Sequence, residues 1–217
     1  MEDGQSMTHK LAIFGISGRT GRELAKVASS QGWEVHGFVR STSEVGGGLV
    51  NGRIVRGDFD EFDRVVETIA GSEAVCCLIG PRPPYTDVFC VTATAAIIAA
   101  MKGTGCHRLV CQTGAMIGPA SNRSRPMEWM ARVFARWQDQ SARDREEQER
   151  LVESSLLDWT IVKPPRLTDS QLPGRVQAGS SLRIGLLSTI SRADLAAFIF
   201  DEVQTGRFVR QRIFVKG

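Results

Sequence analysis

Short apolar runs alternate with amphipathic segments along the first half of the chain. The apolar runs are bounded by glycine or charged residues and predict buried strands at 9–15, 33–40, 51–58, 73–80 and 107–114. Helical spacing of apolar positions predicts helices at 22–32, 60–71 and 86–105. Strands this apolar, separated by helices, indicate an α/β fold with a doubly wound parallel sheet covered on both faces.

The second half is less regular. Residues 126–155 predict one long helix, or two with a break, and Glu146 and Arg150 at i, i+4 spacing support it. A strand at 158–165 ends in prolines, and 166–181 is expected to be loop. A helix at 191–206, with Ser191 as N-cap, and a closing strand at 207–217 complete the pattern.

The predicted organisation is a disordered tail at 1–8 and a single domain at 9–217. Its small, irregular C-terminal portion is expected to bind substrate. The substrate-side segments are predicted at about 81–86, 114–140 and 164–190.

Composition narrows the functional class. The chain has 217 residues and a net charge of +3, from 27 basic and 24 acidic residues, which is too balanced to predict a nucleic-acid-binding protein. The longest apolar stretch, 91–101, is about half of the roughly 20 residues a membrane span needs, and the first ten residues are polar. We therefore expect a cytoplasmic protein that binds neither nucleic acids nor membranes. We also expect it to be a monomer or a homodimer.

The five cysteines predict no metal site. Their number is odd, no pair has CxxC spacing, and the three histidines have no ligand spacing with them. We expect reduced, buried thiols.

A glycine-rich loop joins the first strand to the first helix. In GISGRTG, Gly15 permits the tight turn, Gly18 leaves room for a pyrophosphate, and Gly21 lets the helix pack close to the strand. The helix N-terminus then offers N–H groups to an anion. This is the arrangement of a Rossmann dinucleotide-binding site, with Ser17, Arg19 and Thr20 as further contacts. The alternative is a glycine-rich turn without a ligand.

Arg40, at the end of the second strand, points to the cofactor NADP(H). An NAD enzyme usually has Asp or Glu here to accept from the ribose hydroxyls. Arg40 together with Arg19 can instead hold a 2′-phosphate. Asp58 is predicted either to contact the adenine or to cap the helix that follows it. Phe59, the next residue, is also predicted to contact the cofactor.

The motifs GISGRTG, GDF, LIGPRPP and DWTIVKPP, in this order with Arg40, resemble the atypical short-chain dehydrogenase/reductase superfamily. Within it, the chain is most similar to NAD(P)H-binding, NmrA-like proteins of the biliverdin-IXβ reductase (flavin reductase) type. The likeness covers roughly residues 9–215. It implies the Rossmann fold and the cofactor class, with acceptors such as flavins, tetrapyrroles or quinones. The Tyr-x-x-x-Lys pair of typical short-chain dehydrogenases is absent, since the only tyrosine, Tyr85, has no lysine four residues on.

The carboxyl ends of the strands should surround the nicotinamide. There Thr113 and Lys163 are the catalytic candidates, and either could instead be structural: a strand-end threonine, and a lysine in an ion pair. Both are also predicted to contact the cofactor, together with Gly80, Pro81 and Pro164. The predicted substrate contacts are Arg82, Tyr85, Met116, Trp129, Phe134 and Arg166.

The aromatic residues of 126–137 allow two interpretations. Trp129, Val133 and Trp137 form an i, i+4, i+8 stripe, which is more typical of core than of a ligand wall. With nearby arginines, the same aromatic residues would suit a planar, acidic ligand.

These features predict a reductase that transfers hydride from NADPH to a planar conjugated small molecule: a flavin, quinone or aromatic natural product. Such an acceptor can take its proton from water, so a missing tyrosine is tolerable. Two alternatives stay open. One is a non-enzymatic NADP(H)-binding redox sensor or regulator, and the other is a non-redox cyclase, dehydratase or isomerase on the same fold.

Overall fold

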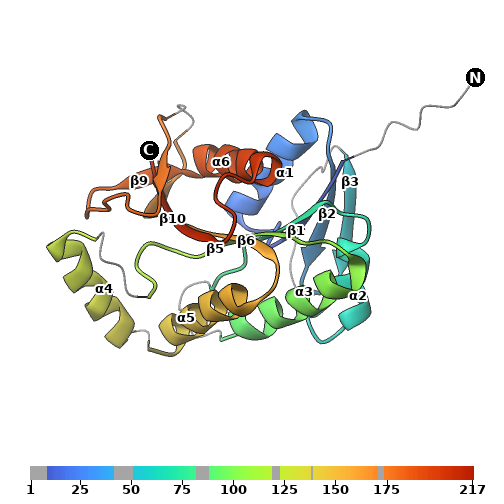
Figure 1. Ribbon diagram of the computed structural model, residues 1–217, viewed down its shortest axis with the longest axis horizontal. Coiled ribbons are helices and arrows are strands. Elements are labelled where there is room, and N and C mark those ends of the chain that lie inside the picture. Colours follow the sequence, from blue (N-terminus) through green and yellow to red (C-terminus); the bar gives the residue numbers. More distant parts are fainter. Residues whose placement is uncertain (1–8, 42–50, 82–87, 119–122, 138, 171–173) are drawn as a thin grey trace, which may run out of the picture.

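The computed structural model describes residues 9–41, 51–81, 88–118, 123–137, 139–170 and 174–217. The tail at 1–8 and the predicted contacts Arg82 and Tyr85 lie outside these ranges. Within them, the chain folds into one large, mostly parallel sheet with helices on both faces (Figure 1).

The sheet contains eight strands in the order β3-β2-β1-β4-β5-β6-β10-β8. Every neighbouring pair is parallel except β10 with β8. The order reverses between β1 and β4, which places a topological switch point at their carboxyl ends. The strands are β1 Lys10–Phe14, β2 Glu34–Val39, β3 Gly52–Arg56, β4 Ala74–Cys77, β5 Arg108–Gln112, β6 Asp158–Lys163, β8 Gln177–Gly179 and β10 Gln211–Lys216.

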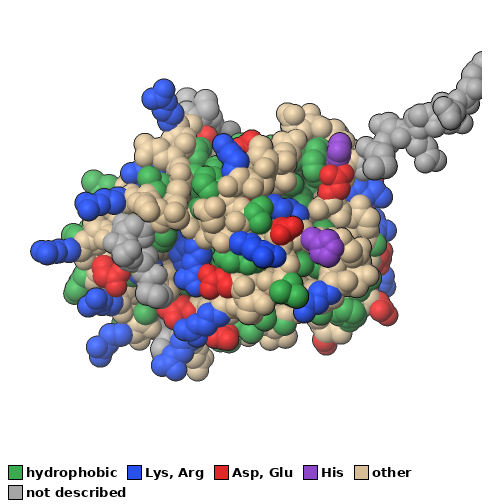
Figure 2. All heavy atoms as spheres, in the orientation of Figure 1, with side chains coloured by type: hydrophobic (Ala, Val, Ile, Leu, Met, Phe, Trp, Pro, Cys, Tyr) green, Lys and Arg blue, Asp and Glu red, His purple; other side chains and the backbone are tan. Residues whose placement is uncertain are grey.

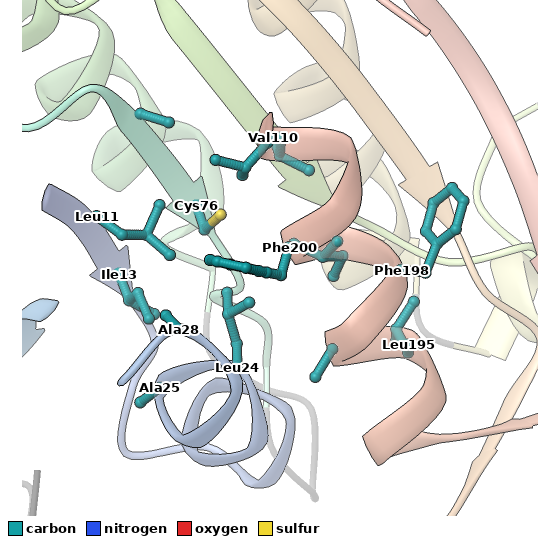
Figure 3. Close-up of a cluster of buried hydrophobic side chains, with 14 of the residues drawn as sticks. Leu11, Ile13, Leu24, Ala25, Ala28, Cys76, Val110, Leu195, Phe198 and Phe200 are labelled. Atoms are coloured by element: carbon teal, nitrogen blue, oxygen red, sulfur yellow. The ribbon is translucent and has the colours of Figure 1, made fainter. Parts of the chain in front are cut away.

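Successive residues of each strand point to opposite faces, so β1 contributes to two cores. Leu11 and Ile13 pack under α1 (Arg19–Ser30) and α6 (Arg192–Thr205), as Figure 3 shows. Ala12 and Phe14 pack on the other face. That face is covered by α2 (Phe62–Ile69), α3 (Cys90–Thr104) and α5 (Asp139–Ser154).

The predicted strands and helices of the first half are confirmed, with ends shifted by a few residues. Ser191 caps α6 as predicted, because its hydroxyl accepts a 2.9 Å hydrogen bond from the backbone N–H of Asp194. All five cysteines are buried free thiols.

The prediction that residues 166–181 form a loop is wrong in part, because two short strands lie in this segment. It contains β7 (Arg166–Thr168), which pairs with β9 (Thr189–Ser191), and β8, which pairs with β10. Strands of three residues have too little periodicity to be seen in the sequence, and pairing with a distant segment is what defines them.

Residues 126–155 form two helices, α4 (Arg125–Trp137) and α5. α4 lies beyond the end of the sheet (Figure 1). The predicted stripe on α4 is exposed rather than core: the exposed fractions are 69% for Trp129, 42% for Val133 and 89% for Trp137. The inward face carries Met127 and Met130 instead, at i, i+3 spacing. Met127 belongs to a small third core with Ala115, Ile184 and Phe214, and Met130 packs against it.

Candidate active site

The glycine loop has the conformation its sequence predicts. Gly15 has φ +92°, a left-handed conformation, and a Cβ there would lie 2.8 Å from the carbonyl of Leu78 after β4. A Cβ at Gly21 would lie 2.3 Å from the carbonyl oxygen of Gly15. These two contacts require glycine and hold the first turn of α1 against the strand end. Gly18 is the N-cap residue, and Thr20 is buried in the first turn.

A groove runs along the loop at the carboxyl ends of β1, β2 and β4. Its floor is formed by Gly15, Ser17 and Gly18, and its far wall by Phe38, Val39, Arg40 and Phe59. The guanidinium of Arg40 lies 5.0 Å above the ring of Phe89, which also lines the groove. None of these lining residues is acidic, and the first turn of α1 carries no acid either. The helix N-terminus and Arg40 therefore give the groove a positive potential suited to phosphates.

Two predicted cofactor contacts lie elsewhere. Arg19 is exposed, and its Nη1 lies 2.8 Å from a carboxylate oxygen of Asp169, which also pairs with Arg192. The structure therefore does not place Arg19 with Arg40 in the groove. Asp58 is exposed, and its backbone N–H donates to Glu61, the N-cap residue of α2.

A second, larger hollow opens beside the groove. This cavity has a volume of about 680 Å³ and is bounded by the carboxyl ends of β5 and β6, the inward face of α4 and the turn at 185–188. Predicted residues that line it are Gly80, Pro81, Thr113, Met116, Phe134, Pro164 and Arg166. Gly80 lines both the groove and the cavity, so the two hollows meet there. Trp129 does not belong to the lining.

A buried polar network lies behind the cavity wall. The hydroxyl of Thr113 donates a 2.6 Å hydrogen bond to Oε1 of Glu149, and Nζ of Lys163 lies 2.5 Å from the same oxygen. Lys163 also donates to the carbonyl of Ile117 at 2.9 Å. Its side chain is 1% exposed, and this burial lowers the pKa of its amine while the Glu149 charge opposes the shift. Thr113 reaches the cavity, whereas Lys163 is the ion-paired residue behind it.

Sequence reasoning missed the contribution of α5. Ser141 and Arg145 line the cavity, and both are buried. Asp144, one residue from Arg145, accepts hydrogen bonds from the backbone N–H groups of Cys90 and Val91 at the start of α3. The spacing carries no signal for this, because residues 139–150 are polar at every position except Ala142 and no face of the helix stands out in the sequence.

The described part of the chain offers neither a metal centre nor a membrane span. It contains no group of three His, Cys, Asp or Glu side chains that could hold a metal ion. Among its helices, none has the length and apolar character needed to cross a bilayer.

Comparisons with known proteins agree with this geometry. The chain is 26% identical to the uncharacterized protein YwnB of Bacillus subtilis (strain 168), over 95% of this chain and 97% of that protein. A short-chain dehydrogenase/reductase from Veillonella parvula, solved in complex with NADP, has a TM-score of 0.80 at 14% identity, covering 96% of this chain and 94% of that one. ChuY, an anaerobillin reductase from Escherichia coli O157:H7, has a TM-score of 0.76 at 18% identity, covering 96% and 97%.

A family model described as NAD(P)H-binding matches residues 15–205, which include the glycine loop, both hollows and α6. The chain therefore belongs to the NAD(P)H-binding family.

Proposed function

We propose that this protein is an NADPH-dependent reductase of a planar conjugated small molecule, such as a flavin, a quinone or an aromatic natural product. One observation carries the proposal: the groove suited to a dinucleotide and the large cavity meet at Gly80, beside the switch point of the sheet. A dinucleotide lying in the groove would present its nicotinamide at that junction. Bound NADPH would supply a hydride.

The residues of the groove fit NADP(H) better than NAD(H). Gly15, Ser17 and Gly18 would hold the pyrophosphate against the N-terminus of α1. Phe38 and Phe59, whose ring centroids are 4.9 Å apart, offer an apolar wall for the adenine. Arg40 stands where the ribose-binding acid of NAD enzymes is expected, and its guanidinium suits a 2′-phosphate.

The cavity favours a flat, largely apolar acceptor. Met116, Met127, Met130 and Phe134 form one side, and thioether and aromatic groups adapt well to aromatic rings. Arg166 also lines the cavity, next to Pro164 and Pro165 in the chain. Figure 2 shows Lys and Arg side chains gathered over the end of the molecule that carries α4, which would favour an acidic ligand.

Two residues have distinct proposed roles in the reaction. Thr113 lines the cavity, and its hydroxyl, which donates to Glu149, could accept a hydrogen bond from a polar group of the acceptor or from the carboxamide of the cofactor. Lys163 acts through Glu149, which it neutralises and positions, so we assign it a positioning role. No Tyr-x-x-x-Lys pair is needed, because a delocalised product can take its proton from solvent.

The test is steady-state NADPH oxidation with a panel of menadione, a second quinone and FMN. We expect turnover with at least one of them, and faster oxidation of NADPH than of NADH at low cofactor concentration. A protein that binds NADPH but turns over none would be a redox sensor. One that converts a substrate without consuming NADPH would be a non-redox enzyme.

A further inference from the structure

Arg145 is a buried cation whose protein partners are uncharged. Its exposed fraction is 7%. Nη1 donates to the carbonyl of Ile79 at 2.7 Å and to the amide oxygen of Gln148 at 2.8 Å, and Nη2 donates to the carbonyl of Gln112 at 3.0 Å. These bonds tie α5 to the carboxyl ends of β4 and β5. They engage three of the five N–H donors of the guanidinium and leave its charge unbalanced. A buried charge is costly unless an opposite charge accompanies it.

The neighbouring carboxylates on α5 are engaged elsewhere. Asp144 accepts from the first N–H groups of α3, and Glu149 pairs with Lys163 at 2.5 Å. Among the described residues, no carboxylate forms an ion pair with Arg145. The opposite charge is therefore expected from outside this set.

The position of Arg145 indicates where that charge would lie. Arg145 lines the cavity, and a Cβ at Gly80 would be 3.9 Å from its Nη1. The guanidinium is thus beside the junction of groove and cavity. Nη1 already donates to two protein oxygens and Nη2 to a third, so the two Nη atoms cannot together form a two-nitrogen fork to a ligand. Arg145 would act on a ligand through its charge and at most the remaining N–H of Nη2.

We propose that Arg145 makes the cavity selective for flat aromatic ligands that carry a negative charge, or gain one on reduction, at the Gly80 end. The second case rests on the proposed function. A hydride added to a neutral quinone brings two electrons and one hydrogen nucleus, which leaves a hydroquinone monoanion. A proton from water then gives the neutral hydroquinone.

Binding of a matched pair of probes, 2-naphthoate and 2-naphthamide, tests the anion site without cofactor. Both have the same ring system and nearly the same shape, and only the carboxylate is charged at pH 7. Calorimetry should show naphthoate bound at least about tenfold more tightly by the wild type, since a charge-assisted contact of about 1.4 kcal/mol corresponds to that factor. Equal affinities, weaker naphthoate binding or no naphthoate binding at millimolar concentration would overturn the proposal without any variant.

Variants locate the charge. Arg145→Gln should erase the preference while leaving naphthamide affinity within a few-fold, and Arg145→Lys should retain part of it. Arg150→Gln, on the exposed side of the same helix, is the matched control and should leave the preference unchanged. A preference that survives Arg145→Gln would overturn the assignment.

Turnover separates the two sources of charge. If the charge is gained on reduction, Arg145→Gln should lower kcat for menadione with little change in KM. If the ligand carries its charge permanently, KM for an anionic acceptor should rise instead. A naphthoate preference without any NADPH oxidation would keep the anion site and reject the proposed reductase function.

Discussion

The hydroxyl of Thr113 donates a 2.6 Å hydrogen bond to Oε1 of Glu149, an oxygen that also accepts from Lys163. The bond fixes the direction of the hydroxyl of Thr113, which directly follows β5 and lines the cavity. Thr113 is therefore oriented by a buried carboxylate that does not line the cavity.

This relationship predicts a specific loss in Thr113→Val, which keeps the side-chain shape and removes the hydroxyl. We expect kcat to fall by about tenfold or more, which corresponds to about 1.4 kcal/mol of lost transition-state stabilisation. Thr113→Ser, which keeps the hydroxyl, should retain most of the activity. Steady-state kinetics with menadione measure both variants, and equal kcat values for Val and wild type would reject a role for the hydroxyl.

Gly18→Val should abolish NADPH binding while the protein remains folded. Gly18 lines the groove at the N-cap of α1, and a side chain there would take up space beside the phosphate site. Its backbone, at φ −74°, accepts a side chain, although the Cβ would lie 3.1 Å from the carbonyl oxygen of Gly15. Binding is measured by calorimetry and folding by circular dichroism. Gly103→Val is the matched control, because a Cβ at Gly103 meets no atom within 4 Å. Normal NADPH binding by Gly18→Val would mean that the loop is not the phosphate site.

The two faces of α4 should behave differently. Phe134→Ala should raise KM for an aromatic acceptor, because Phe134 lines the cavity. Trp137→Ala should leave KM unchanged and should alter the free energy of unfolding by no more than about 0.5 kcal/mol, since Trp137 is 89% exposed. Kinetics and thermal unfolding of the two variants separate them, and the reverse pattern would place the ligand on the outer face.

Glu128 should contribute stability that depends on pH. Hydrogen bonding to Arg123, at 3.0 Å, holds the pKa of Glu128 below its usual range. Arg123 also bonds the carbonyls of Ala115 and Ile117, so the pair fastens α4 to the cavity wall. Because the folded-state pKa is depressed, the stabilisation is fully present above the unfolded pKa and is lost as pH falls through the folded pKa.

Glu128→Gln should therefore cost roughly 1 kcal/mol at neutral pH, a modest value because the carboxylate is 32% exposed. The difference from wild type should shrink toward zero in acid. Urea unfolding of the wild type and of Glu128→Gln at pH 7 and at pH 3 measures the stability difference at each pH. A difference that stays constant with pH would contradict a stabilising role for the Glu128 carboxylate.

The parts that follow local rules were predictable from sequence. The strand–loop–helix unit around Gly15 and Gly21 has strict backbone requirements, and so its sequence predicts its structure closely. The Arg145 and Glu149 positions were missed because charged residues on a helix usually face solvent, and here a polar face is buried by α3 and the strand ends. The exposed Trp129 was misjudged for the converse reason, since periodicity shows a stripe without showing which side has a partner.

Arg40 is the centre of the cofactor assignment, and calorimetry of NADPH and NADH tests it most directly. We expect the wild type to bind NADPH at least about tenfold more tightly than NADH, because a charge-assisted contact to the 2′-phosphate contributes about 1.5–3 kcal/mol. Arg40→Ala should remove most of that preference, whereas Arg19→Ala, which loses an ion pair with Asp169, should keep most of it. Equal affinity of the wild type for the two cofactors would contradict the account.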